Sequence, residues 1–140
     1  MKYIVDTNIV SELTKKAPNP SVITWLENNK DDAYLTVITI EEMKFGGLML
    51  PDGKRKQALL KTIDELIQVY EPRTLSLDAQ AAEQCAQLHV KAVLAGRTPT
   101  IEDLMVGALC LTHKATLVTR NVKDFDYLDI PLLNPFEPQF

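Results

Sequence analysis

The stretch Lys2-Tyr3-Ile4-Val5-Asp6-Thr7-Asn8 decides the fold that the sequence predicts. Three apolar, β-favouring residues run directly into an acid and two small hydrogen-bonding residues, as in a buried parallel strand whose end opens into a cleft. Ligands of open α/β sheets bind outside the carboxyl ends of the strands, so we expect Asp6 to lie at a binding cleft. This stretch alone leaves an alternative equally open, namely that Asp6 caps the following turn, which Asp before Thr-Asn does readily.

The whole chain has the composition of one soluble globular domain. Its 140 residues, 46% of them hydrophobic and 24% charged, predict a single domain over residues 1–140 with a sizeable core. No apolar run reaches the roughly 20 residues of a membrane span, and no signal-peptide pattern opens the chain, so we expect a cytoplasmic protein. A net charge of −4 argues against bulk-charge binding of nucleic acid. Any such binding must be local, metal-assisted or built by assembly.

The cysteines and histidines form no metal-binding pattern. Cys85 and Cys110 lie in helix-like stretches without CxxC spacing, so we expect buried free thiols. His89 and His113 are each isolated from other candidate ligands. These observations disfavour a zinc site.

Strands and helices alternate along the chain, which predicts an α/β fold with a central parallel sheet and helices on both faces. Asp78 is a suitable N-cap and Gly96 a suitable stop for one of the helices. The tail over 134–140 carries two prolines and should be extended against the body or loose. After the first strand we expect strands over 33–38, 73–77, 115–119 and 130–133, and helices over 9–14, 21–28, 39–50, 54–70, 78–95 and 100–113.

One short pattern occurs twice, as Thr39-Ile40-Glu41-Glu42-Met43 and as Thr100-Ile101-Glu102-Asp103-Leu104, each time at the start of a predicted helix. A threonine followed three residues later by an acid is a capping box, so Glu42 and Asp103 have a structural interpretation as caps. The functional interpretation is that Glu42 and Asp103 both face the cleft of Asp6. The helix that carries Glu42 directly follows a predicted strand, and the helix that carries Asp103 precedes one, so both helix starts can lie at that edge of the sheet. A further polar stretch, Thr119-Arg120-Asn121-Val122-Lys123-Asp124-Phe125, follows the fourth strand.

If these stretches share one edge of the sheet, Asp6, Glu42, Asp103 and one of Asn121 or Asp124 converge. Carboxylates brought together repel one another and raise one or more pKa values. Such a cluster needs a hard divalent cation, and Mg²⁺ or Mn²⁺ suits oxygen ligands with water completing the shell. A metal held in this way can polarise a phosphoryl oxygen and activate water, which describes phosphodiester hydrolysis.

The order and spacing of four stretches resemble those of PIN-domain proteins, and more closely of VapC-type toxins of bacterial toxin–antitoxin pairs and the related FitB-like proteins. The resemblance covers nearly the whole chain. It implies a three-layer α/β sandwich with a central parallel sheet, Mg²⁺-dependent endoribonuclease activity and inhibition by a small VapB-like antitoxin. The matching stretches are Ile4-Val5-Asp6-Thr7-Asn8, Ile38-Thr39-Ile40-Glu41-Glu42-Met43, Asp103-Leu104-Met105-Val106-Gly107-Ala108 and Leu117-Val118-Thr119-Arg120-Asn121-Val122-Lys123-Asp124-Phe125.

The same resemblance implies roles for individual residues. Asp6, Glu42 and Asp103 take the places of the first three family acids, which leaves Glu41 and Glu102 outside the site. Many family members have an acid in the last motif, where this chain has Asn121 with Asp124 three residues on, so either one can complete the site. Thr7, Asn8 and Thr119 would then orient carboxylates and water.

The leading hypothesis is a Mg²⁺-dependent endoribonuclease toxin, with Mn²⁺ able to substitute, in which water attacks the phosphodiester and leaves a 5′-phosphate. The alternative is a catalytically weak PIN-like module that works with an antitoxin-like partner in a DNA-bound regulatory complex. A phosphate-transfer domain of flavodoxin-like architecture is disfavoured because Asp6-Thr7-Asn8 lacks a second nearby aspartate.

An acidic protein needs a local surface for RNA, and similar proteins form dimers, so we expect a homodimer or higher assembly that joins two such surfaces. In the complex with the antitoxin, operator DNA is a further expected partner. The candidates for a phosphate-binding rim are Lys15, Lys16, Lys44, Arg97, Arg120 and Lys123, which flank the motif acids.

Overall fold

Parallel strands form the centre of the molecule, in the order β3-β2-β1-β4-β5. The computed structural model describes residues 1–137. In the middle of the sheet, Tyr3 of β1 lies opposite Ala33 of β2 on one side and Thr116 of β4 on the other. The carboxyl ends of β1, β2 and β4 therefore meet at one edge. The strands are β1 (Tyr3–Val5), β2 (Ala33–Thr36), β3 (Thr74–Leu75), β4 (Thr116–Val118) and β5 (Leu132–Leu133).

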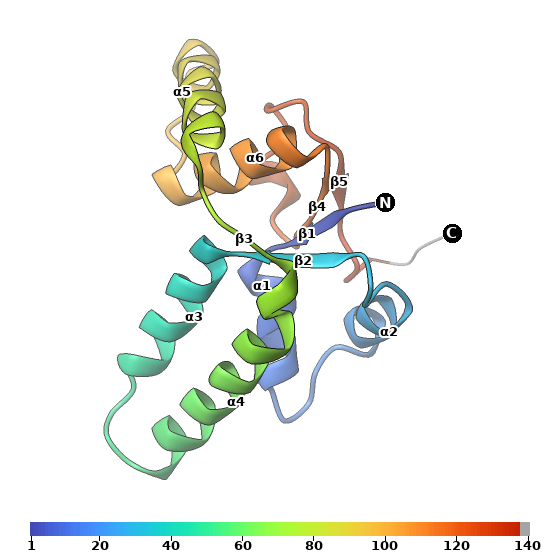
Figure 1. Ribbon diagram of the computed structural model, residues 1–140, viewed down its shortest axis with the longest axis vertical. Helices are drawn as coiled ribbons and strands as arrows, with labels where there is room; N and C mark the ends of the chain where they lie inside the picture. The colour runs from blue at the N-terminus through green and yellow to red at the C-terminus, as the bar shows by residue number, and fades with distance from the viewer. Residues whose placement is uncertain (138–140) are drawn as a thin grey trace.

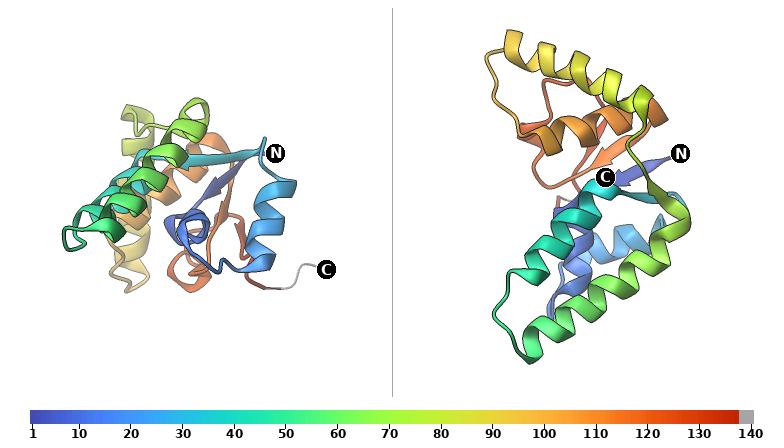
Figure 2. Two further views of the ribbon diagram at one scale, coloured as in Figure 1. Left: turned by 90° about the horizontal axis from the view of Figure 1, so that it is seen from below. Right: turned by 60° about the vertical axis from the view of Figure 1, so that its left-hand side comes forward.

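Helices cover both faces of this sheet, with α5 and α6 on one side and α1 to α4 on the other (Figures 1 and 2). The three-layer α/β sandwich with a parallel sheet is thereby confirmed. The helices are α1 (Thr7–Val10), α2 (Pro20–Asn28), α3 (Val37–Leu48), α4 (Lys54–Tyr70), α5 (Ala79–Leu94) and α6 (Ile101–His113), and short 3₁₀ turns span Ser11–Thr14, Glu71–Arg73 and Val122–Asp124. No helix within residues 1–137 is long and apolar enough to cross a membrane.

Alternation along the strands divides the apolar residues between two cores. Ile4 and Leu117 point into the core beneath α5 and α6, whereas Val5 and Val118 point into the core shared with α1, α2 and α4. All four side chains are fully buried. Successive side chains of a strand point to opposite faces of the sheet. Because helices cover both faces here, the strands are apolar at successive positions and not only at alternate ones. Cys85 and Cys110 are buried free thiols, as predicted.

Several element boundaries confirm the sequence predictions. Helix α4 spans residues 54–70 as expected, and Asp78 caps α5 by accepting the N–H of Ala81 at 2.9 Å. Gly96 ends α5 with φ 73°, a left-handed conformation that glycine adopts without steric cost. In the tail, Pro135 O accepts a hydrogen bond from the Ser21 hydroxyl of α2 at 2.7 Å and Phe136 packs against the core, so this part of the tail lies against the body. Residues 138–140 of the predicted tail lie outside the described residues.

The start of α3 was predicted wrongly. Thr36, not Thr39, is its N-cap, since the Thr36 hydroxyl accepts the Thr39 N–H at 3.3 Å. The strand expected over 33–38 therefore ends at Thr36, and Val37 and Ile38 lie in the first helical turn. Their β-branched side chains favour strand, but the cap and the tertiary packing of α3 outweigh that weak preference.

Other boundaries differ by smaller amounts. The helix expected over 9–14 begins at Thr7 and becomes a 3₁₀ turn from Ser11 onward. Pro20, expected in a loop, is the first residue of α2, where its missing N–H costs nothing, with Asn19 as N-cap. The strands expected over 73–77, 115–119 and 130–133 are shorter, and α3 ends two residues before position 50.

Two adjacent glycines of α3 give a matched test of how α3 packs against α4. A Cβ at Gly46 would meet nothing within 4 Å, whereas one at Gly47 would lie 2.8 Å from Leu60 Cδ2 and 3.1 Å from Ile63 Cδ1. We expect Gly46→Ala to raise the free energy of unfolding by about 0.5–1 kcal/mol, because alanine favours helix. Gly47→Ala should be less stable than Gly46→Ala by about 1 kcal/mol, because the terminal methyl groups of Leu60 and Ile63 must shift to admit the new Cβ. Denaturant unfolding measures both, and equal stabilities of the two variants would contradict the α3–α4 packing.

Candidate active site

Asp6 is buried at the end of β1, with only 9% of its surface exposed. Its carboxylate accepts three hydrogen bonds, from the Thr7 N–H at 2.9 Å, the Thr119 hydroxyl at 2.9 Å and the Asn8 side-chain amide at 3.2 Å. Burial raises the pKa of Asp6 and these hydrogen bonds lower it, with burial the larger effect. Asp6 therefore caps α1, as the structural interpretation expects, and it also lies at the carboxyl edge of the sheet, where its binding role stays a prediction.

Thr119 joins the ends of β4 and β1. Its single hydroxyl hydrogen goes to Asp6, because a carboxylate can only accept. Its oxygen accepts the Asn121 N–H at 3.0 Å and the Asn8 amide at 3.4 Å. Asn8 in turn accepts the Arg120 N–H at 3.0 Å. The structure thus places Thr119 and Asn8 where they fix the orientation of the Asp6 carboxylate.

Glu42 approaches this network from α3. The Thr7 hydroxyl donates to Glu42 Oε1 at 2.6 Å and lies 3.2 Å from the Thr39 hydroxyl. Because α3 begins at Val37, Glu42 is in its second turn and is not the acid of a capping box, so that interpretation is wrong here. Burial raises the pKa of Glu42 against the effect of the Thr7 bond, and the charges of Asp6, Glu102 and Glu41 raise it further.

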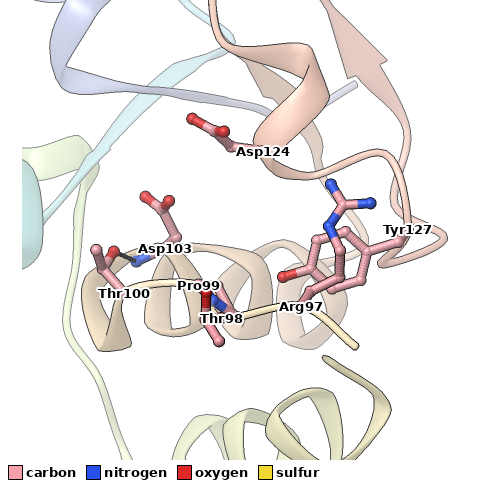
Figure 3. Close-up of a pocket in the computed structure, with 7 residues that line it drawn as sticks. All are labelled: Arg97, Thr98, Pro99, Thr100, Asp103, Asp124 and Tyr127. Atoms are coloured by element: carbon pink, nitrogen blue, oxygen red, sulfur yellow. Dashed lines mark hydrogen bonds between the residues drawn. The ribbon is translucent and has the colours of Figure 1, made fainter. Parts of the chain in front are cut away.

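Asp103 lies in the first turn of α6, where half of the predicted capping box is present. The Thr100 hydroxyl accepts the Asp103 N–H at 3.2 Å. The Asp103 carboxylate, however, points away from the cap and toward the space that Asp124 also faces (Figure 3). Its pKa is raised to about 6, first by burial and then by the charges of Asp6, Asp124, Glu42 and Glu102. The side chain therefore belongs to the acidic cluster and not to the helix cap.

Asp124 and Asn121, the two candidates for the fourth position, lie in different surroundings. Asp124 lines a pocket of about 300 Å³ together with Asp103, and its charge raises the pKa of both Asp6 and Asp103. Both side chains are exposed, but Asn121 lines no part of this pocket, and its main-chain N–H and C=O carry the hydrogen bonds that the described structure gives it. The segment forms a 3₁₀ turn, yet only Asp124 lines that pocket. The structure brings Asp124, more than Asn121, together with the other acids.

The donors near this cluster suit a hard cation bound largely through water. Within residues 1–137, no three Asp, Glu, His or Cys side chains already stand close enough together to hold a metal ion. Mg²⁺ usually takes one or two carboxylates directly and keeps several waters, so widely spaced acids are compatible with it. The nearby Cys110 is no ligand, because burial and the charge of Asp6 raise the pKa of its thiol. The metal-binding roles of the four acids remain predictions.

The predicted rim of cations proves to be largely paired. Lys44 binds Asp64 at 2.8 Å, and Lys15 binds the buried Glu12. Lys16 and Lys123 are exposed. The two arginines stack on aromatic rings that the sequence analysis did not single out, Arg97 on Tyr127 and Arg120 on Phe136, with guanidinium-to-centroid distances of 4.4 and 4.5 Å. These partners are 30 and 16 residues apart in the chain, a separation that no local pattern reveals.

Comparison with known proteins agrees with this fold. Residues 3–130 match the model of the PIN domain, so the chain belongs to the PIN-domain family. Within that family it is of the VapC/FitB toxin type. It is 30% identical over 135 residues to Toxin FitB of Neisseria gonorrhoeae, covering 95% of this chain and 97% of that one. It is 29% identical over 137 residues to VapC ribonuclease Y4jK of Sinorhizobium fredii, covering 96% and 98%.

A solved structure supports the same assignment. The structure of FitAB bound to an IR36 DNA fragment superposes with a TM-score of 0.91 at 29% identity, covering 99% of this chain and 98% of that one.

Replacing Thr119 tests whether its hydroxyl holds Asp6. Thr119→Val removes the donor to a buried carboxylate and the acceptor of the Asn121 N–H, so it should cost about 1–3 kcal/mol of unfolding free energy. Thr119→Ser keeps the hydroxyl and serves as the control. In thermal melts, the rise in melting temperature on adding Mn²⁺ should persist in Thr119→Ser and shrink in Thr119→Val. An undiminished rise in Thr119→Val would show that Asp6 needs no support from this hydroxyl.

Proposed function

We propose that this protein is a Mg²⁺-dependent endoribonuclease and the toxin of a toxin–antitoxin pair. The observation that carries the proposal is that Asp6, Glu42, Asp103 and Asp124 all lie toward the carboxyl edge of the sheet, where burial first, and then the charges of the other acids, raise the pKa of Asp103 to about 6. No cationic side chain of the described residues forms an ion pair with any of these four acids. A divalent cation is the ligand that such a site favours.

The four acids have two different parts in the proposed reaction. Asp6, Asp103 and Asp124 would hold Mg²⁺, which when bound would polarise a phosphoryl oxygen and make water a better nucleophile. Thr119 and Asn8 keep the Asp6 carboxylate in one orientation. Positioning of this kind contributes to catalysis because it is in place before the substrate binds.

Glu42 is suited to take a proton from the attacking water. The Thr7 hydroxyl occupies Oε1, which leaves Oε2 free to accept that proton. Burial raises the pKa of Glu42, which makes it a stronger base than an ordinary glutamate. Attack at phosphorus would form a new P–O bond and break the P–O3′ bond, so that the products are a 5′-phosphate and a 3′-hydroxyl whose oxygen takes its proton from solvent.

The proposed partners are an RNA substrate, a small VapB-like antitoxin and, for the complex, operator DNA. The related FitAB was solved with a DNA fragment, and the relative Y4jK is named a ribonuclease. Exposed apolar side chains on α3 and directly after its end also favour a protein partner, since Phe45 is 60% and Met49 69% exposed.

A second candidate function is a PIN-like module with weak or no cleavage that acts with an antitoxin-like partner in a DNA-bound regulatory complex. The DNA fragment in the FitAB structure favours this alternative. It differs from the leading proposal in one respect that experiment can resolve, because it requires no metal-dependent turnover.

The test is RNA cleavage by the purified chain, free of any antitoxin. With Mg²⁺ or Mn²⁺ the parent should cleave RNA, and EDTA should stop the reaction. Asp6→Asn and Asp103→Asn should each lower the rate at least about 100-fold, since the reacting phosphate depends on the site they form. Glu41→Gln, which changes an adjacent acid outside the predicted site, should keep most of the activity.

Equal cleavage in EDTA, or full activity of Asp6→Asn, would contradict the proposed mechanism. A parent that fails to cleave RNA but forms a DNA-binding complex with its antitoxin would establish the alternative.

A further inference from the structure

The pocket that Asp103 and Asp124 share continues away from the acidic cluster to a single cation. Besides the two acids, it is lined by Arg97, Thr98, Pro99, Thr100 and Tyr127 (Figure 3). Arg97 is the only cationic residue of the seven. One side of the pocket therefore carries the negative charge of the proposed metal site, and the other side carries a fixed positive charge.

Arg97 is held in place from two directions. Its Nη2 donates to Lys123 O at 2.8 Å and reaches Asp126 Oδ1 at 3.4 Å. Its guanidinium lies over the Tyr127 ring at 4.4 Å from the centroid. Stacking and hydrogen bonding together restrict the side chain, so little further ordering is needed when it binds a ligand.

Most of the donor capacity of Arg97 remains free. A guanidinium has five N–H groups, and the two contacts of Nη2 leave those of Nε and Nη1 without a partner among the described residues. Arg97 also forms no ion pair with Asp103 or Asp124, and its side chain remains 43% exposed. Although Nη2 pairs with Asp126, a charged and accessible guanidinium whose Nε and Nη1 hydrogens are unpaired is suited to two oxygens of one phosphate.

We propose that this pocket is a subsite for a phosphate of the RNA strand next to the scissile bond, with Arg97 as the residue that binds it. The inference rests on the proposed ribonuclease function and assigns one contact with the RNA substrate to Arg97. A strand whose scissile phosphate lies at the acids extends along the pocket, and Arg97 is the cation that meets its next phosphate. In an acidic protein, one such contact supplies attraction that bulk charge does not.

A purely structural role for Arg97 is the rival explanation. Lys123 O precedes Asp124 in the chain, so the hydrogen bond from Arg97 also holds the turn that carries this acid. If that were its whole role, replacing Arg97 would weaken Mn²⁺ binding and leave the number of phosphate contacts unchanged.

The salt dependence of RNA binding separates the two explanations. The probe is a fluorescein-labelled single-stranded RNA of ten nucleotides, bound in Mg²⁺ to the full chain carrying Asp6→Asn so that the RNA is not consumed. In that background Arg97→Met should raise Kd about tenfold. It should also lower the slope of log Kd against log salt concentration by about 0.7, the contribution of one phosphate on a single strand. Arg97→Lys should keep the slope and weaken binding less.

Arg73→Met is the matched control, because Arg73 also stacks on a tyrosine and donates to a backbone carbonyl. It lies over Tyr70 at 5.5 Å and bonds Ala33 O at 3.0 Å, at the opposite edge of the sheet. Its Kd and salt slope should equal those of the Asp6→Asn parent.

Each outcome bears on the subsite separately from the ribonuclease function. An unchanged salt slope in Arg97→Met overturns the subsite, and a loss of Mn²⁺ affinity in the same variant would then identify the structural role. If the salt slope is unchanged but the parent chain with Asp6 intact cleaves RNA, the subsite is wrong and the proposed ribonuclease function still holds. If that chain cleaves nothing but Arg97→Met still loses one phosphate of salt dependence, the subsite holds as an RNA contact and the catalytic proposal fails.

Discussion

The central constraint on this structure is that four negative charges share one edge of a parallel sheet without an internal counter-ion. Asp6, the most buried of them, is satisfied by neutral donors, the Thr119 hydroxyl and two amide groups. Nearby cations pair elsewhere, Lys44 with Asp64 and Arg97 with Asp126. Neutral donors satisfy the lone pairs of a carboxylate but leave its charge uncompensated. The fold thus orients its acids while preserving the negative potential that attracts a cation.

This arrangement has a cost that depends on pH. The pKa of Asp103 is raised to about 6 in the folded chain from an ordinary value of 3.8. Between these values the folded state binds more protons than the unfolded state, so stability in the absence of metal falls as pH rises through about 6. Below the ordinary pKa both states are protonated and the penalty is absent. A divalent cation that binds only the folded state would restore the lost stability above pH 6. The same acids therefore destabilise the free protein and would stabilise the metal-bound one.

Local sequence patterns predicted the elements, and the position of Asp6 at the end of a strand, because both depend on neighbouring residues. An apolar run ending in Asp6 specifies a buried strand with a polar end, and Asp78 and Thr100 are caps whose partners lie three residues away. The start of α3 was missed because Thr36 and Thr39 are both suitable caps, and tertiary packing decides between them. The choice between Asn121 and Asp124 depends on how one 3₁₀ turn lies against α6. The stacking of Arg97 on Tyr127 joins segments 30 residues apart, which no periodicity encodes.

Proton release on metal binding tests the central claim most directly. It measures both the raised pKa of Asp103 in the metal-free protein and the loss of its proton when a cation binds. Mn²⁺ is titrated calorimetrically into the full chain at several pH values, each in buffers of different ionisation enthalpy. Near pH 6, where Asp103 is about half protonated, binding should release roughly half a proton, and the release should vanish above about pH 8. Asp103→Asn should bind Mn²⁺ more weakly and release fewer protons at pH 6. Binding without proton release near pH 6, and with the same affinity in Asp103→Asn, would contradict the account.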